Sequence, residues 1–238
     1  MPEMAGIDEA ALAAAASWDT KPISILTPSA QTRTAVPESW WPVVEAADPD
    51  ERKRIAVQRW DAEFLDLIPR FADALHSQLV DVRAAKHDWL DAPSLDYVLR
   101  TEEGELAVWV GEDPRTFGAT APPYFESLPE PAREFLRQTH AGFTTWDGES
   151  CGLIAPRHMT TLAARWGDPD SNDILEWEED DYVFPGTQRL LFVTEGGSDA
   201  SLCTSPDLPA GLAITYFEPD FEVKPFGEAL DQFMNLPL

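Results

Sequence analysis

The chain has 238 residues and carries 43 Asp and Glu against 17 Lys and Arg, a formal net charge of −26. Such a field repels nucleic-acid phosphates and anionic lipid headgroups, so we expect no direct nucleic-acid binding and no attachment to an anionic membrane surface, whereas a basic protein would be attracted at long range. Hydrophobic residues make up 44% of the chain, which excludes a disordered protein and suffices for a sizeable core.

The acidic composition has a second explanation, general solubility or adaptation to a salty cytoplasm, because only four of the 17 cations are Lys. An apolar run of Ala near the N-terminus follows Glu3, Asp8 and Glu9 and no basic segment, unlike a secretory signal. The chain has no run of about 18 apolar residues, the length that a membrane-spanning helix needs. We therefore expect a cytoplasmic protein without a membrane span.

Residues 1–50 contain six prolines and few long periodic segments, a composition typical of an N-terminal arm. Within this arm, the sequence Trp-Trp-Pro-Val-Val at positions 40–44 is too apolar to remain in water. We expect this part of the arm to pack on the folded body.

A helical stripe of apolar residues follows between positions 51 and 88. The stripe steps by three or four residues and consists of Phe64, Ile68, Phe71, Leu75, Leu79 and Val82. Because proline is tolerated in the first turn of a helix but breaks its interior, Pro69 predicts one helix that ends near Leu67 and a second that starts at Pro69. His76 and His87 have no potential metal ligand at a suitable spacing, so we expect surface or core-edge imidazoles.

Alternating apolar residues at 95–101 and 106–110 flank the sequence Glu-Glu-Gly-Glu and predict a β-hairpin. A loop rich in Pro, Gly and Thr comes next, and we place a boundary at about 120–127. The sequence thus predicts an arm over 1–50, a helix and β-hairpin elaboration over 51–126, and a core over 127–238.

The core region predicts a second group of elements. We expect a short helix from Ser127 to Gln138, strands at 190–194, 201–203, 212–217 and 221–223, and a closing helix whose stripe is Phe226, Leu230, Phe233 and Met234. Asn235 and Pro237 end that helix. These elements predict an α+β fold, a mostly antiparallel sheet flanked by helices.

The order of these elements resembles the SUKH superfamily, which includes the yeast cell-wall-synthesis regulator Smi/Knr. The resemblance is carried by LPEPAREFL at 128–136 with Gly142 and Phe143, by LFV at 191–193, EGGSD at 195–199 and Leu202-Cys203, and by the closing helix at 226–234. It implies a compact SUKH-like α+β domain with no catalytic centre, whose bacterial members act as immunity proteins that bind a cognate toxin. No site residues transfer from the family.

The sequence contains no phosphate-binding loop, dinucleotide glycine pattern, zinc-protease motif or Gly-x-Ser-x-Gly. Residues 168–173 resemble a calcium loop but lack its glycine and its final glutamate. A pairing of Cys151 with His140 or His158 is the one nucleophile arrangement to consider, and we expect Cys151 and Cys203 to be buried free thiols, with a disulfide between them as the alternative. We expect no enzyme, no cofactor and no metal; a metal-dependent hydrolase built on 168–181 remains the alternative.

The stretch NDILEWEEDDYVF at 172–184 combines carboxylates with aromatic residues. Trp and Tyr anchor many interfaces, while charges at the rim govern encounter rate and specificity. We therefore predict a partner-binding segment that consists of Asp173, Glu176, Trp177, Glu178, Glu179, Asp180, Asp181 and Tyr182. A solvated acidic loop between core aromatics is the alternative. With the resemblance, this predicts an immunity protein that neutralises a basic toxin, for example a nuclease, or otherwise a regulatory or scaffold module of the same fold.

Overall fold

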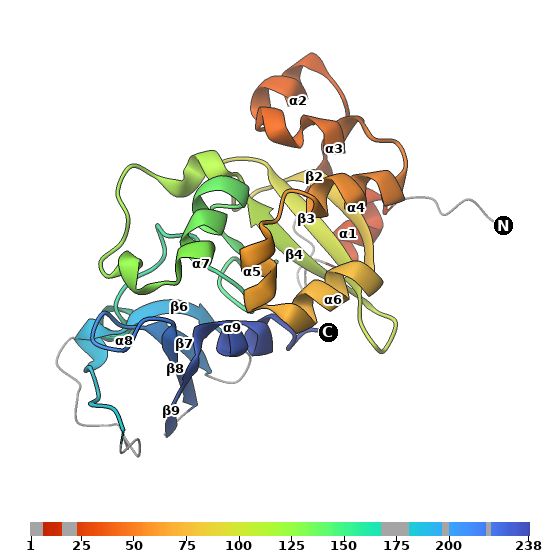
Figure 1. Ribbon diagram of the computed structural model, residues 1–238. Coiled ribbons are helices and arrows are strands. Elements are labelled where there is room, and N and C mark those ends of the chain that lie inside the picture. The colour runs from red at the N-terminus through yellow and green to blue at the C-terminus, as the bar shows by residue number, and fades with distance from the viewer. Residues whose placement is uncertain (1–6, 16–22, 168–180, 197–199, 218–219) are drawn as a thin grey trace.

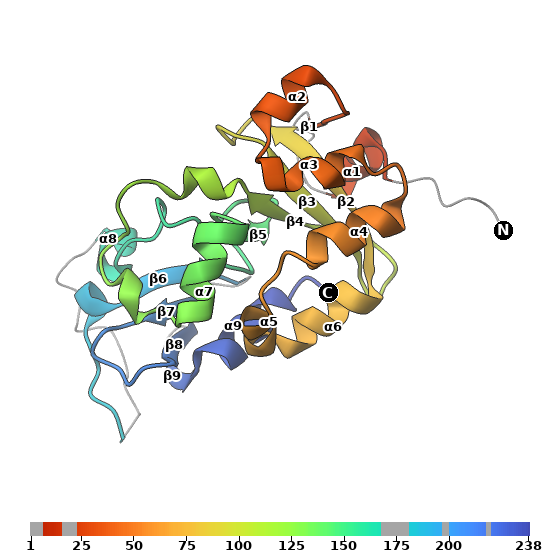
Figure 2. The same cartoon turned by 45° about the horizontal axis from the view of Figure 1, so that its top comes forward.

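The computed structural model describes residues 7–15, 23–167, 181–196, 200–217 and 220–238. Their arrangement is α+β, as predicted, with two antiparallel sheets of five and four strands and helices packed on both. Figures 1 and 2 show the four-stranded sheet at one end of the molecule and helices α2 and α3 at the other. The five-stranded sheet lies between them.

The N-terminal region forms short elements rather than a plain arm. They are α1 (Glu9–Ala15), β1 (Ile23–Ile25), α2 (Ala30–Ala35), the 3-10 helix η1 (Glu38–Trp40), α3 (Trp41–Glu45), α4 (Pro49–Val57), α5 (Ala62–Leu67) and α6 (Pro69–Ser77). The break between α5 and α6 at Pro69 is confirmed. Trp40 and Val43 are fully buried, so the predicted packing of the segment 40–44 on the body is confirmed too.

The five-stranded sheet is a meander in the order β1-β2-β3-β4-β5. Its other strands are β2 (Leu79–His87), β3 (Ser94–Arg100), β4 (Leu106–Glu112) and β5 (Phe143–Thr145). The predicted hairpin is β3 and β4, with Val98 opposite Val108. The sequence did not predict β1, β2 or β5.

Alternation along β3 and β4 gives this sheet two buried faces. Val98, Val108 and Val110 pack with Leu12 of α1 in a small cluster on one face. Tyr97 and the other inward side chains belong to the main core on the opposite face, which also receives residues of α4, α5 and α6. Helices therefore cover the sheet on both sides.

The prediction that Leu79 and Val82 continue the helical stripe is wrong, because both residues lie in β2. Helix α6 ends with the N–H of Gln78 bonded to the carbonyl of Ala74. In a regular strand, residues three positions apart point to opposite faces. A β-bulge between Leu79 and Asp81 shifts the register, and both apolar side chains enter the main core. The bulge therefore places two apolar residues three positions apart on the same face of the strand, a spacing that is otherwise typical of a helix.

The remaining elements follow the predicted order. They are the 3-10 helices η2 (Pro114–Phe117) and η3 (Phe125–Ser127), α7 (Glu130–Glu134), a π-helical turn η4 (Phe135–Thr139), α8 (Leu162–Trp166), η5 (Thr187–Arg189), β6 (Leu191–Glu195), β7 (Ser201–Thr204), β8 (Leu212–Phe217), β9 (Asp220–Pro225) and α9 (Phe226–Met234). The four predicted strands form the second meander, β6-β7-β8-β9. The closing helix packs on this sheet and on α5 and α6.

The main core crosses the predicted boundary near 120–127. Phe64 of α5 stacks on Phe135 with ring centroids 4.0 Å apart, and Trp60 meets Phe143 edge to face at 4.9 Å. The three-part division of the chain stays a prediction. Cys151 and Cys203 are buried free thiols, as predicted.

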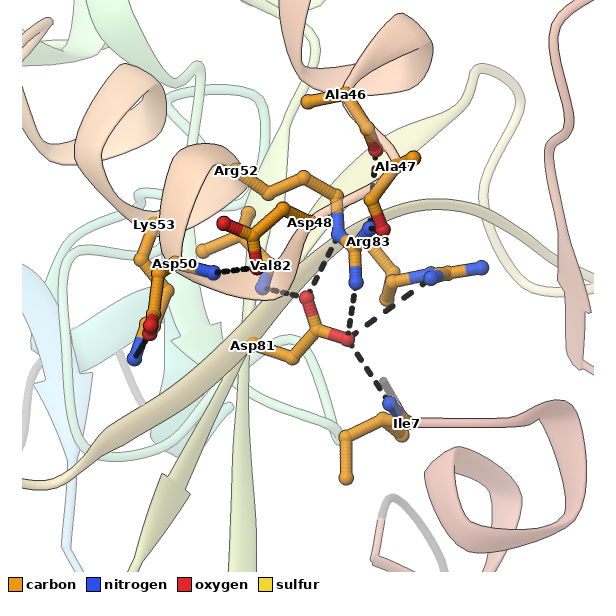
Figure 3. A network of polar contacts seen from close by, with 10 residues as sticks. All are labelled: Ile7, Ala46, Ala47, Asp48, Asp50, Arg52, Lys53, Asp81, Val82 and Arg83. Carbon is orange, nitrogen blue, oxygen red and sulfur yellow. Dashed lines mark hydrogen bonds and ion pairs between the residues drawn. The ribbon is translucent and has the colours of Figure 1, made fainter. Parts of the chain in front are cut away.

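A buried ion pair joins α4, β2 and the N-terminal segment (Figure 3). Arg52 donates two hydrogen bonds of 2.8 Å to the two carboxylate oxygens of Asp81, which are fully buried. The backbone N–H groups of Val82 and Ile7 donate to the same carboxylate at 2.8 and 2.9 Å. Because its charge is paired and its oxygens are hydrogen-bonded, the carboxylate tolerates burial and holds the three segments together.

Candidate partner-binding surface

Two of the predicted partner-binding residues, Asp181 and Tyr182, belong to the described chain. The other six, Asp173, Glu176, Trp177, Glu178, Glu179 and Asp180, lie outside the described residues, as does the calcium-like loop at 168–173. The site can therefore be built from the segment 181–189, which leads into β6.

Side chains of this segment point alternately inward and outward. Tyr182 and Phe184 are half-buried and pack against the main core, and the Phe184 ring lies 5.4 Å from that of Phe221. Asp181 is exposed, and Val183 is 88% exposed. Two aromatic rings thus anchor this segment, the strip 181–189, which presents an acid and an apolar side chain to solvent. The prediction that Tyr182 binds a partner remains open, although its ring contacts the core.

The far end of the strip is fixed by Arg189 of η5. Its guanidinium donates to both carboxylate oxygens of Asp207, at 2.7 and 2.6 Å, and lies 4.8 Å from the centre of the Tyr124 ring. The hydrogen bond to Asp207 raises the pKa of Arg189 and lowers that of Asp207. A bidentate pair of this kind has a defined geometry, so it fixes the position of the end of the strip that leads into β6.

The basic side chains of the described chain are largely engaged with its own carboxylates. Ion pairs include Arg52, Lys53, Arg54, Arg70, Arg83, Arg115, Arg133, Arg137, Arg157, Arg165, Arg189 and Lys224. Many exposed carboxylates have no ion pair with another described residue, among them Glu38, Glu45, Asp61, Glu63, Asp66, Glu102, Glu103, Glu105 and Glu130. The outward field is therefore negative over several elements, and a basic surface would complement it.

Cys151 does not form the arrangement that a catalytic dyad requires. Burial raises the pKa of its thiol to about 12, with further contributions from Asp147 and Glu195, so the thiolate is disfavoured. His158 is exposed, and within the described residues neither His158 nor His140 hydrogen-bonds to the thiol. The Cys–His alternative has no geometric support here.

His140 instead lies inside the main core. The indole N–H of Trp60 donates to the Tyr97 hydroxyl at 3.1 Å, and that hydroxyl lies 2.9 Å from His140 Nε2. Because an indole only donates, the Tyr97 O–H is free to donate to the imidazole. Burial lowers the pKa of His140 to about 3, so the ring is neutral. A Cβ on Gly111 would lie 2.5 Å from this ring, and only glycine fits there.

A second buried polar group, which sequence reasoning missed, joins β2 and β3. His87 Nε2 lies 2.8 Å from Asp96, whose other oxygen accepts a 2.7 Å hydrogen bond from the Ser94 hydroxyl. The serine bonds to the carboxylate and not to the imidazole, so these three groups lack the order of a nucleophile, base and acid. The sequence signal for this group is the spacing of Ser94 and Asp96, which lie two residues apart and therefore on one face of β3. Their partner His87 lies on β2, and the spacing does not indicate it.

Within the described ranges, no cluster of three or more His, Cys, Asp or Glu side chains is placed to hold a metal ion. None of the helices in those ranges has the length and apolar character needed to cross a membrane.

Comparison with known proteins gave no relative. No protein-family model matches the chain, and no curated protein or solved structure does either. The resemblance to the SUKH superfamily therefore stays a prediction from sequence.

Proposed function

We propose that this chain is a cytoplasmic immunity protein that binds a basic toxin domain and neutralises it by stoichiometric, non-catalytic binding. The observation that carries the proposal is the charge imbalance at the surface. The net charge is −26, and the chain's own cations are largely paired internally, which leaves exposed carboxylates available to a partner. Toxins that cleave nucleic acid need a basic cleft, so such an enzyme complements this surface.

The strip 181–189 supplies the apolar part of the proposed contact. A valine that is 88% exposed gains free energy when a partner covers it, and the neighbouring Asp181 offers a charge to the rim of the same contact. The aromatic rings of Tyr182 and Phe184 hold the strip on the body, so little ordering entropy is lost on binding. The negative surface charge accelerates the encounter with the basic toxin, and the strip positions the bound toxin.

The test is capture of the partner from the native cell with the full chain, followed by calorimetry and a toxicity assay. We expect a tight one-to-one complex with a basic toxin domain and loss of its toxicity when this chain is co-expressed. The association rate should fall steeply with added salt, because the screening length is only about 8 Å at physiological ionic strength. Recovery of housekeeping proteins alone would instead favour the regulatory or scaffold module.

A paired substitution tests the strip itself. Asp181→Asn with Val183→Ser removes the exposed charge and apolar side chain, and we expect affinity for the captured toxin to fall at least about tenfold, or roughly 1.4 kcal/mol. The matched control is Glu103→Gln with Leu236→Ser, since Glu103 is exposed and Leu236 is 53% exposed elsewhere on the surface. Equal affinities for the two double variants would place the interface away from the strip.

A further inference from the structure

A groove of about 540 Å³ lies among α4, α5, α6 and the start of β2, away from the strip 181–189. Figures 1 and 2 show these three helices following one another along one side of the molecule. The groove has apolar walls formed by Val57, Trp60, Leu65, Leu75 and Leu79. Its volume is that of a site for a small organic molecule, and apolar lining with a few polar groups is typical of such sites.

The polar part of the groove is basic, in contrast to the rest of the protein. Lys53, Arg54, His76 and Gln58 line it, and none of the described residues that line it is an Asp or Glu. Lys53 is paired at 2.6 Å with Asp50, whose side chain is 83% exposed, and Arg54 lies 4.0 Å from Glu51. Exposed pairs of this kind contribute little free energy, so an anion in the groove can replace either carboxylate at small cost.

Trp60 gives the groove a rigid wall. Trp60 is 5% exposed, and its indole N–H donates to the Tyr97 hydroxyl, which in turn bonds to His140. The ring also meets Phe135 and Phe143 edge to face, with centroids 4.9 Å away in both cases. Fixed on its inner side, the indole is preorganised for an apolar group, and less ordering entropy is lost when that group binds.

We propose that this groove binds an amphipathic monocarboxylate, with its aliphatic or aromatic body against Trp60 and the leucines and its carboxylate at Lys53 and Arg54. The basic side chains that line the groove favour a carboxylate over other amphipathic molecules. An apolar amine would be repelled by the basic lining, and a neutral molecule of the same shape would form no ion pair with Lys53 or Arg54. The site is independent of the proposed toxin contact, so either proposal can fail alone.

The probe is decanoate, used below its micelle concentration with the full chain. Binding is followed by calorimetry and by the NMR signal of the Trp60 indole N–H, assigned with Trp60→Phe. We expect saturable binding at one site and a shift of that signal. Decan-1-ol should bind at least about tenfold more weakly, and decyltrimethylammonium should not shift the signal.

Two variants locate the site. Lys53→Met with Arg54→Met should weaken decanoate at least about tenfold while leaving decan-1-ol unchanged, and Val57→Glu should weaken both by placing a charge in the groove. The charge-matched control, Lys86→Met with Arg100→Met, changes exposed basic residues outside the groove and should bind like the parent. Equal binding of the three amphiphiles, or an unchanged affinity in the Lys53 and Arg54 variant, would overturn the proposal.

Discussion

Two buried histidines, His140 and His87, have pKa shifts in opposite directions. His140 is surrounded by Trp40, Trp60 and Phe143 and has no carboxylate partner among the described residues, so burial lowers its pKa to about 3 and keeps it neutral. His87 is buried as well, and burial alone opposes its charged form. The charge and hydrogen bond of Asp96 outweigh this and raise the pKa of His87 above its usual 6.5. The charge state of these buried histidines therefore depends on whether a neighbouring carboxylate offsets the effect of burial.

The two histidines should therefore affect stability with opposite signs of pH dependence. The folded pKa of His140 lies below its unfolded 6.5, so its contribution is present above that value and is lost as pH falls toward 3. By about pH 5 the loss amounts to about 2 kcal/mol. The folded pKa of His87 is raised, so its contribution is present below 6.5 and is lost as pH rises through the folded pKa.

Urea unfolding at about pH 7.5 and about pH 5 measures both effects. We expect the stability deficit of His140→Phe relative to the parent to shrink at the lower pH, because the parent loses stability there and the variant does not. The deficit of His87→Gln should grow at the lower pH. Identical pH slopes in the parent and both variants would show that these pKa shifts are absent.

Among the secondary-structure elements, a contact between segments distant in the sequence fixes the position of helix α6. Asp231 of α9 caps α6 from another part of the chain. The backbone N–H groups of Arg70 and Phe71 donate to its carboxylate at 3.2 and 2.9 Å, and the Arg70 side chain donates at 3.0 Å. A carboxylate at a helix N-terminus satisfies free N–H groups and complements the helix dipole. This contact positions α6, which carries Leu75 and His76 of the groove.

Asp231→Ala tests the cap. We expect the free energy of unfolding to fall by about 2 kcal/mol, because the buried N–H of Phe71 and the part-buried N–H of Arg70 lose a charged acceptor. Thermal and urea unfolding measure the change, and decanoate binding should weaken as α6 loosens. Glu228→Ala is the control, since Glu228 is exposed on the same helix. A loss no larger than that of the control would mean that water replaces the cap without cost.

At the scale of the whole molecule, the charge of −26 opposes the folded state. Like charges are closer together in the compact chain than in the unfolded one, and part of the folding free energy is spent against their repulsion. The internal ion pairs offset this locally, but most of those in the described chain have at least one exposed side chain, where solvent screens the attraction. Salt screens both interactions, and the excess of acids makes the repulsion the larger of the two.

Added NaCl should therefore stabilise the protein. We expect the thermal midpoint to rise between about 0.05 and about 0.5 M salt, a range over which the screening length falls below about 10 Å. A variant with Gln at Glu102, Glu103 and Glu105, which are exposed in the turn between β3 and β4, should start from a higher midpoint and respond less. A midpoint that falls with salt would show that ion pairs dominate.

Local sequence is sufficient for the features that depend on neighbouring residues and on composition. Pro69 ends α5 because proline breaks a helix interior, alternation at 95–101 and 106–110 makes β3 and β4, and the apolar stripe at 226–234 makes α9. The acid excess follows from composition alone. Of the predicted partner-binding residues, Asp181 is exposed and Tyr182 is half-buried against the core, and partner binding by all eight residues stays a prediction.

Features that need residues distant in sequence depend on how the whole chain packs. The bulge at Leu79 and Asp81 appears only when β2 pairs with β3, and the cap by Asp231 joins helices about 160 positions apart. The groove likewise needs α4 and α6 to be placed around Trp60. A local pattern sets which face of an element is apolar, but the partner that covers that face is chosen by the packing of the whole chain, which no short window of sequence contains.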